Sequence, residues 1–416
     1  MFLLLLGVVF AEKFWVLTDS HFDDKYVANS PSLCTAIDCC HADSRARSGA
    51  EDQLSGVCGD YNCYAPISLW ESALEYIKDH KNESNTIYWM MDVVPADYVH
   101  MSKKVNKQRV QQEVDLLKKY LPDFQVYPVP GNHDYYWSSW WQYPPESQWM
   151  LEFMGDLFAP WLSDDALETF KKGGYYSMKL NDKVRAVALH LAYVDVFNIH
   201  FEKYNKEDPA GMVQWFNDTL RAAKENSEKI FLFSHECVGL KQSGLTDLAP
   251  KFNQDFNNLM LEYHDIMLTH ICGHSHYDSF RILPSLENSL YSCIVNPDMT
   301  FHGNTDARFR LMERDDDKVL GWTQYVLDLE KCNQNGKHEW EVQYNTKELY
   351  GTTEYSTEGI KEFVERLHND EETWNTFIKL YSTHGGHNCD ADCKKTMLCA
   401  LQSVTEADFK KCKESN

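Results

Sequence analysis

The feature that most constrains the fold is an alternation of short apolar runs with amphipathic stretches. Seven runs are rich in the β-branched and aromatic residues that strands favour, and they span residues 14–17, 86–91, 125–129, 184–191, 230–233, 266–272 and 291–295. Between them, helical periodicity marks residues 69–78, 105–120, 212–226 and 252–263. Strands that alternate with helices predict an α/β fold built from packed layers.

Two further regions follow this alternation. Runs at 321–329 and 338–344 flank a turn-forming segment at 333–336 and predict a β-hairpin. Beyond residue 351 the chain is polar and helical in pattern. A chain of 416 residues with 43% hydrophobic residues is large and apolar enough for one main domain with an appendage. We expect a main domain over 12–350 and a small, disulfide-rich helical subdomain over 351–416.

The N-terminus and the cysteines indicate the compartment. Residues 1–11, MFLLLLGVVFA, are typical of a cleaved secretory signal, and a retained, buried first strand is the alternative. Thirteen cysteines, clustered at 34–63 and 389–412, predict disulfides rather than zinc fingers. The odd total leaves one thiol unpaired, with candidates that include Cys237, Cys272, Cys293 and Cys332. With glycosylation signals at Asn82 and Asn217, these features predict a secreted or lumenal glycoprotein, either lysosomal, vesicular or extracellular.

Net charge limits the partners. The chain has 40 Lys and Arg against 63 Asp and Glu, a net charge of -23. Such a surface repels phosphate backbones, so binding to a nucleic-acid polymer is not expected. A small anionic substrate remains compatible if a bound metal reverses the field locally. We expect the protein to act as a monomer.

Five short motifs with metal-ligating side chains follow predicted strands. They are Asp19-Ser20-His21, Asp92, Gly131-Asn132-His133-Asp134, His235 and Gly273-His274-Ser275-His276. Residues at the carboxyl ends of neighbouring strands meet in one crevice. Asp, Asn and His without a thiolate suit zinc, manganese or iron rather than calcium. Seven ligands are too many for one tetrahedral ion, so we predict two ions that share a carboxylate, an arrangement suited to phosphoryl chemistry.

The motif order DxH, D, GNHD, H and GHxH resembles the calcineurin-like metallophosphoesterases, and within them the acid sphingomyelinase-like phosphodiesterases. Further similarity comes from the cysteine-rich insertion after the DxH motif, the aromatic and proline residues after GNHD, the segment from YVLDLEK to ELYG, and the terminal cysteine spacing. The resemblance covers most of the chain. It implies a central β-sandwich flanked by helices, with 12–350 as the catalytic domain.

The resemblance also implies a role for each motif residue. One ion would be held by Asp19, His21 and His276, the other by Asn132, His235 and His274, and both by a bridging Asp92. Zn²⁺ is the expected metal. His133 would face the scissile phosphate, either stabilising charge or donating a proton, and a purely supporting role is its alternative. Asp134 is a candidate to orient an imidazole.

The sequence departs from the family at three places. Met91 stands where a glycine usually precedes the aspartate, and Ala96 stands where a histidine would protonate the leaving group. Without that histidine, good leaving groups such as phosphate should be cleaved better than alkoxides, with Asp97 as a candidate substitute acid. His235 is followed by Glu236-Cys237-Val238-Gly239 instead of prolines, which we expect to alter loop shape more than ligation.

These features predict a binuclear-metal phosphohydrolase that uses a metal-bridging hydroxide on small soluble phosphodiesters or phosphoanhydrides, such as nucleotides or nucleotide-choline esters. Asp19 comes too early for the lipid-extracting saposin domain of sphingomyelinases, although peripheral membrane contact is compatible. The alternatives are a sphingomyelin phosphodiesterase that releases phosphocholine and ceramide, and a non-catalytic secreted metal-binding protein. The aromatic segment 135–141 is either a platform for a nucleobase or lipid or, as we expect, a packed loop.

Overall fold

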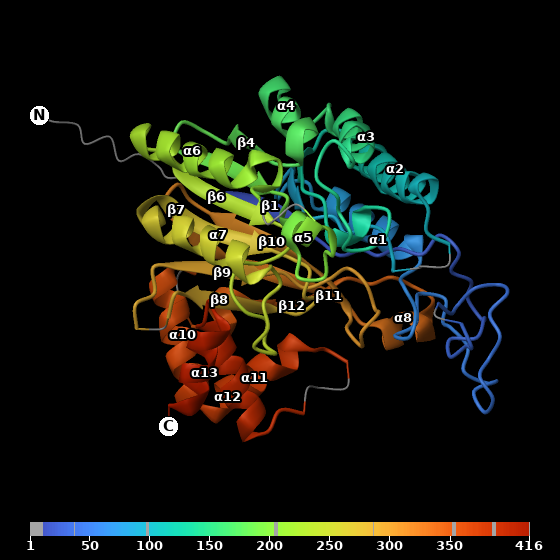
Figure 1. The fold of residues 1–416 in the computed structure, drawn as a ribbon. Helices are drawn as coiled ribbons and strands as arrows, with labels where there is room; N and C mark the ends of the chain where they lie inside the picture. The colour runs from blue at the N-terminus through green and yellow to red at the C-terminus, as the bar shows by residue number, and fades with distance from the viewer. Residues whose placement is uncertain are drawn as a thin grey trace, which may run out of the picture.

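The computed structural model describes residues 11–36, 38–96, 100–203, 207–285, 287–351, 355–384 and 388–415. In these residues two six-stranded mixed sheets form the centre of the molecule (Figure 1). The first sheet has the order β12-β11-β10-β1-β2-β3, with strands Glu341–Asn345, Val319–Leu327, Ala307–Arg314, Glu12–Leu17, Thr86–Trp89 and Gln125–Pro128. The second has the order β4-β5-β6-β7-β9-β8, with strands Tyr176–Lys179, Val184–Leu189, Lys229–Ser234, Met267–Cys272, Tyr291–Val295 and Ser279–Leu283.

Aromatic side chains fill the space between the sheets. The ring of Phe14 in β1 lies 4.9 Å from that of Tyr88 in β2 and 5.2 Å from that of Phe231 in β6. Tyr88 also contacts Phe233 at 5.1 Å between ring centroids. All four side chains are fully buried, and edge-to-face packing of such large groups stabilises the contact between the layers. The predicted β-sandwich is confirmed.

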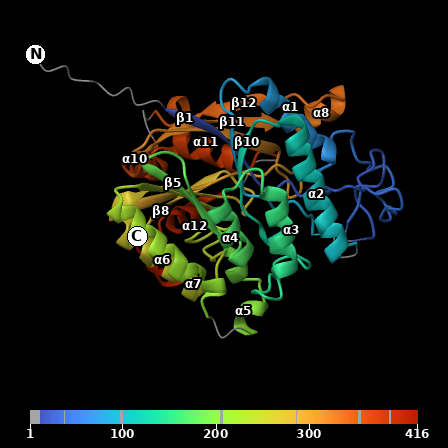
Figure 2. The ribbon, with the colours of Figure 1, turned by 90° about the horizontal axis from the view of Figure 1, so that it is seen from above.

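Helices cover the outer faces of the sandwich (Figure 2). Near the first sheet lie α1 (Ile67–Asp79), α2 (Lys103–Tyr120) and α3 (Gln148–Phe158), followed along the chain by α4 (Asp164–Gly173). The second sheet is flanked by α6 (Met212–Glu225) and α7 (Pro250–Glu262). The C-terminal helices α10 (Thr357–Asn369), α11 (Glu371–Tyr381), α12 (Ala391–Leu401) and α13 (Glu406–Glu414) gather below β8 in Figure 1, where Phe363 lies 5.7 Å from Phe280.

The seven predicted strands and four predicted helices are all present. The sequence pattern did not predict β4, β8, β10, α3 and α4. The predicted hairpin is correct in its pairing, because β11 and β12 run antiparallel side by side. Its predicted turn is wrong. The connection contains the helix α8 (Leu329–Asn335), whose first turn is capped by the Asp328 side chain and which ends at Gly336 with φ +66°.

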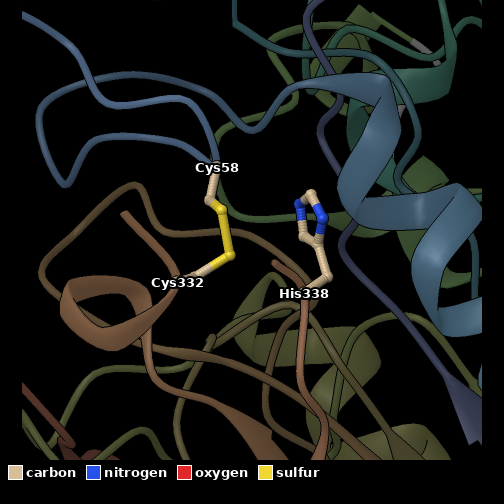
Figure 3. Close-up of side chains that lie close together, drawn as sticks. All are labelled: Cys58, Cys332 and His338. Carbon is tan, nitrogen blue, oxygen red and sulfur yellow. A yellow bond between two sulfur atoms is a disulfide. The ribbon is translucent and has the colours of Figure 1, made fainter. Parts of the chain in front are cut away.

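Disulfides connect most of the cysteines. The pairs are Cys34–Cys39, Cys40–Cys63, Cys58–Cys332, Cys237–Cys272, Cys389–Cys393 and Cys399–Cys412. The Cys58–Cys332 bond ties the cysteine-rich segment after β1 to α8, and His338 lies beside it (Figure 3). Because both sulfurs are bonded to each other, this group offers no thiolate to a metal. Cys293 is the buried free cysteine.

The remaining sequence predictions concern the signal segment, Asp97, the glycosylation signals and membrane-spanning helices. Residues 1–10 of the predicted signal lie outside the described residues, as does Asp97. Asn82 is exposed, whereas Asn217 is half-buried in α6 and accepts a hydrogen bond from the Tyr263 hydroxyl. Among the helices that the structure describes, none is long and apolar enough to cross a membrane.

Candidate metal centre

The five motifs follow strands whose carboxyl ends meet. In the first sheet β1, β2 and β3 are parallel neighbours, and in the second β6 and β7 are. The motif residues come directly after these strands, with Asp19 and His21 after β1, Asp92 after β2, Asn132 and His133 after β3, His235 after β6, and His274 and His276 after β7. The sandwich therefore brings all seven predicted ligands and His133 to one edge.

The first cluster consists of Asp19, His21 and His276. Nε2 of His21 lies 3.2 Å from Nε2 of His276, and Oδ1 of Asp19 lies 3.3 Å from Nε2 of His276. Nδ1 of His21 donates to the carbonyl of Val94 at 3.0 Å, and Nδ1 of His276 faces the Asp298 carboxylate at 3.0 Å. Each ring therefore turns Nε2 towards the cluster.

The first cluster favours positive charge. Burial lowers the pKa of His276, but Asp298 and Asp19 outweigh it and raise that pKa to about 10. Asp19 is fully buried, and its Oδ1 accepts no hydrogen bond from the described residues. Burial raises the pKa of Asp19, yet His235 and His276 bring it well below its ordinary value. A divalent ion can bind the carboxylate and both imidazole nitrogens at once, whereas a proton can be shared by only two of these groups. The three residues therefore fit a metal.

The second cluster consists of Asn132, His235 and His274. Oδ1 of Asn132 lies 3.1 Å from Nε2 of His235 and 3.0 Å from Nδ1 of His274. Nδ1 of His235 donates to the carbonyl of Met90 at 2.8 Å, and the Asn132 amide donates to the hydroxyl of Ser139 at 2.8 Å. The lone pair of His235 and the amide oxygen thus face each other, which fits a cation bound between them.

Asp92 lies between the two clusters. Its Oδ2 is 3.2 Å from Nε2 of His21 and 3.3 Å from Nε2 of His235. Its Oδ1 accepts the backbone N–H of His133 at 2.6 Å. Burial raises the pKa of Asp92, but the surrounding histidines, His235 first, lower it below its ordinary value. One ionised carboxylate therefore contacts both clusters.

His133 borders the first cluster. Its ring centroid lies 4.8 Å from that of His21, and its Nδ1 has no hydrogen-bond partner in the part of the chain that the structure describes. Burial lowers the pKa of His133 to about 3, so the imidazole is neutral at ordinary pH. Asp134, by contrast, accepts no hydrogen bond from an imidazole of the described residues. It accepts the backbone N–H groups of Asp92, Val93 and Gly131, so its predicted orienting role is wrong.

The loops that carry these residues adopt strained backbone conformations. Left-handed φ values of +36° to +66° occur at Asp19, His21, Met91, Asp92, His274 and His276. Each costs a non-glycine residue about 1–3 kcal/mol, and such strain persists where the surroundings impose it. Here the backbone N–H of Asp19 donates to Met91 O at 2.7 Å, and that of His21 donates to Asp92 O at 3.1 Å. Met91 thus keeps a positive φ without glycine.

The glycines of two motifs permit close approach of a carboxylate. A Cβ at Gly131 would collide with the side chain of Asp92, and a Cβ at Gly273 would collide with Thr18 and Asp19. This explains the glycine before Asn132 and the glycine before His274 in steric terms.

Two buried carboxylates near the clusters were absent from the sequence prediction. Asp298 supports His276, and it follows the predicted strand 291–295 closely, so the same strand-end signal applied to it. Asp247 has Oδ1 3.5 Å from Nε2 of His274. It lies in a loop without any strand-end motif, so no local signal marked it.

The aromatic segment divides into two parts. Tyr135 and Trp141 are buried and stack with ring centroids 4.7 Å apart, as a packed loop should. Trp137 and Trp140 are each 37% exposed. The packed-loop prediction is therefore right for the first pair and wrong for the second.

Comparison with known proteins identifies the family. Residues 12–278 match the calcineurin-like phosphoesterase family, and residues 286–416 match the C-terminal region of acid sphingomyelin phosphodiesterase. The chain is 26% identical to sphingomyelinase phosphodiesterase C of Dictyostelium discoideum over 96% of this chain and 92% of that protein. It is also 26% identical to the cyclic GMP-AMP phosphodiesterase SMPDL3A of Homo sapiens, over 96% of this chain and 89% of that one.

A third relative is longer. The chain is 26% identical to sphingomyelin phosphodiesterase of Bos taurus over 93% of its own residues but only 63% of that protein. The match over residues 12–278 spans well over half of the sequence, and it includes every residue of both clusters. The calcineurin-like fold implies two metal ions, and the chain is a phosphoric ester hydrolase by family. The chain belongs to the calcineurin-like phosphoesterases.

Proposed function

We propose that the protein is a phosphodiesterase whose two clusters each hold one divalent ion. Asp19, His21 and His276 are the ligands of the first ion, and Asn132, His235 and His274 are those of the second. Asp92 contacts both ions. The single observation that carries this proposal is the position of Asp92 Oδ2, 3.2 Å and 3.3 Å from the inward nitrogens of one histidine in each cluster.

The ions supply positive charge to the phosphoryl oxygens and lower the pKa of water at the site. The chain's own residues position the substrate. His133 remains neutral because of its lowered pKa, so it acts as an N–H donor to a phosphoryl oxygen rather than as a cation. Its backbone contact with Asp92 holds the ring beside the first cluster. We propose Zn²⁺ for the first ion, because the two imidazoles of the first cluster and the carboxylates of Asp19 and Asp92 suit a tetrahedral ion.

For the substrate, we propose a small soluble phosphodiester or phosphoanhydride such as a nucleotide or a nucleotide-choline ester. The similarity to a cyclic GMP-AMP phosphodiesterase supports a nucleotide. Half-exposed Trp137 and Trp140, with ring centroids 5.7 Å apart, offer flat surfaces on which a base can stack. Both belong to the loop that follows His133.

The lipid alternative has an observation of its own. Phe197 and Ile199 are 64% and 56% exposed, and Asn198 donates to Trp141 O at 2.8 Å, which places this apolar segment against the aromatic loop. Exposed apolar side chains beside the aromatic loop also suit peripheral contact with a membrane that presents sphingomyelin. Six disulfides support a secreted or lumenal compartment. We propose a monomer.

An assay with metal-loaded protein tests these alternatives. Turnover is measured side by side on ATP, CDP-choline, cyclic GMP-AMP and sphingomyelin, with bound metal determined on the same samples. We expect hydrolysis of at least one of the soluble substrates and two ions per chain. Exclusive turnover of sphingomyelin would refute the substrate class, and two bound ions without any turnover would favour a non-catalytic metal-binding protein.

A variant tests the assignment of the bridging residue. Asp92→Asn keeps the shape and the hydrogen bond from His133 but removes the negative charge that both clusters share. We expect metal content and rate to fall together. Asp156→Asn is the matched control, because Asp156 is an exposed carboxylate that pairs with Lys171 and belongs to none of the motifs. Full activity in Asp92→Asn would contradict the bridging role.

A further inference from the structure

Glu236, the residue after His235, has no part in the clusters described above. It is fully buried, and among the described residues neither of its carboxylate oxygens has a hydrogen-bond partner in another residue; its own backbone N–H interacts with the carboxylate. Burial of a carboxylate without a partner is strongly unfavourable. A neutral carboxylic acid would not remove the problem, since its O–H would then be buried without an acceptor.

The Glu236 side chain reaches the second cluster. One of its carboxylate oxygens, a ring nitrogen of His235 and a ring nitrogen of His274 all lie within 4.8 Å of one another. Ligands on opposite sides of one ion stand about 4 Å apart or slightly more, because each bond is roughly 2.1 Å long. The limit of 4.8 Å on these separations is close to that span, so small shifts of the side chains would let all three atoms bind one ion. The rings of His235 and His274 are 5.2 Å apart and nearly perpendicular.

Protein cations do not account for this carboxylate. Lys241 and Arg281 are the basic side chains near the second cluster, and both pair with Asp247 at 2.8 Å. The charged groups close enough to act on Glu236 include the acids Asp195 and Asp92 and the neighbouring His235. Among the described residues, no lysine or arginine forms an ion pair with Glu236, because the two nearby ones are both engaged by Asp247.

We propose that Glu236 is an additional ligand of the ion held by Asn132, His235 and His274. The inference rests on the proposed two-ion site and goes beyond it in assigning a metal preference. With Asp92, the second ion then has two nitrogen and three oxygen ligands, against two nitrogens and two carboxylates at the first. Five protein ligands exceed tetrahedral coordination, and added carboxylate oxygen favours harder, six-coordinate ions such as Mn²⁺ over Zn²⁺. The centre therefore binds two different metals, Zn²⁺ at the first cluster and Mn²⁺ at the second.

Metal titration of the whole chain tests this directly. Protein stripped with a chelator is titrated with Mn²⁺, Zn²⁺ and Co²⁺, and affinity, stoichiometry and the visible spectrum of bound Co²⁺ are recorded. We expect wild type to bind two ions, one of them with the weak Co²⁺ absorption of high coordination. Glu236→Leu should lower Mn²⁺ affinity at one site by at least about tenfold, because even the loss of a hydrogen-bond partner of a metal ligand has an effect of this size. It should also intensify the Co²⁺ spectrum, while leaving the other site unchanged.

Two further variants separate ligation from general electrostatics. Asp195→Asn removes a buried neighbouring charge without removing a proposed ligand, and it should leave the Co²⁺ spectrum as in wild type. Glu236→Gln keeps the shape of the side chain and should show an intermediate loss. Melting of the metal-free proteins checks folding, and Glu236→Leu should melt no lower than wild type because an unpaired buried carboxyl group is gone.

The outcomes distinguish this inference from the proposed function. If wild type binds two ions and Glu236→Leu binds them with the same affinities and the same Co²⁺ spectrum, the ligand assignment is overturned while the two-ion site stands. Equal losses in Asp195→Asn and Glu236→Leu would also overturn it, because charge alone would then account for the effect. If wild type binds no ions, the proposed function itself fails.

Discussion

Replacement of Asp298 by asparagine tests how the protein orients His276, a proposed metal ligand. Nδ1 of His276 faces the carboxylate of Asp298 at 3.0 Å, and the Thr305 hydroxyl donates to the same oxygen at 3.0 Å. Asp298→Asn preserves the shape and an acceptor oxygen but removes the charge. We therefore expect His276 to stay in place and to become a weaker ligand.

The size of the effect follows from this hydrogen bond. A bond to a charged group contributes about 1.5–3 kcal/mol and a neutral one about 0.5–1.5 kcal/mol, so the substitution costs roughly 1–1.5 kcal/mol. Because about 1.4 kcal/mol corresponds to a factor of ten, metal affinity at the first cluster should fall about tenfold. That value lies at the lower end of the roughly 10–100-fold losses seen for partners of metal-bound histidines.

The assay is competition for metal between stripped protein and a chromophoric chelator. Asp278→Asn is the control, since Asp278 is also a buried carboxylate but bonds to Arg310, Gln324 and Tyr344 instead of a motif histidine. We expect Asp278→Asn to lower the melting temperature without changing metal affinity. Unchanged affinity in Asp298→Asn, or an equal loss in both variants, would refute the reasoning.

Three other predictions concern catalysis, covalent connection and pH. His133→Ala keeps the backbone N–H that contacts Asp92 but removes the imidazole donor, so kcat should fall about 10²–10³-fold with metal content unchanged, and loss of metal would contradict this role. The double variant Cys58→Ser with Cys332→Ser opens a link between residues 274 positions apart and should lower the free energy of unfolding by up to about 5 kcal/mol in denaturant titrations without reductant. Burial lowers the pKa of His270 to about 3, below its value of about 6.5 in the unfolded chain. The neutral imidazole therefore contributes fully to the free energy of unfolding above pH 6.5. This contribution is lost as pH falls towards 3, by up to about 1.4 kcal/mol per pH unit. His270→Gln, which retains a donor to the Ser234 hydroxyl, should flatten that slope, and an unaltered slope would disprove the assignment.

Local sequence was sufficient for most of the strands and for the prediction that the candidate metal ligands lie at one edge of the sheets. Runs such as 230–233 and 291–295 carry their strand preference in their own composition, independent of distant residues. His235 and His274 were recognisable because each follows such a run, and parallel strands end at the same edge of a sheet. The edge strand β4 and the helix α8 were missed, since short elements depend on packing and capping more than on periodicity.

Contacts between distant segments were beyond the reach of sequence patterns. Cys58 pairs with Cys332, and Asp298 supports His276. The sequence around each of these residues does not indicate which residue is its partner. From the sequence, Glu236 was expected only to alter the shape of a loop. Its burial, the absence of hydrogen bonds from other described residues and its closeness to His274 became apparent only in the folded structure. The physical reason is that strand and helix preferences arise from neighbours along the chain. Desolvation, charge and metal ligation arise from whichever groups the folded layers bring together.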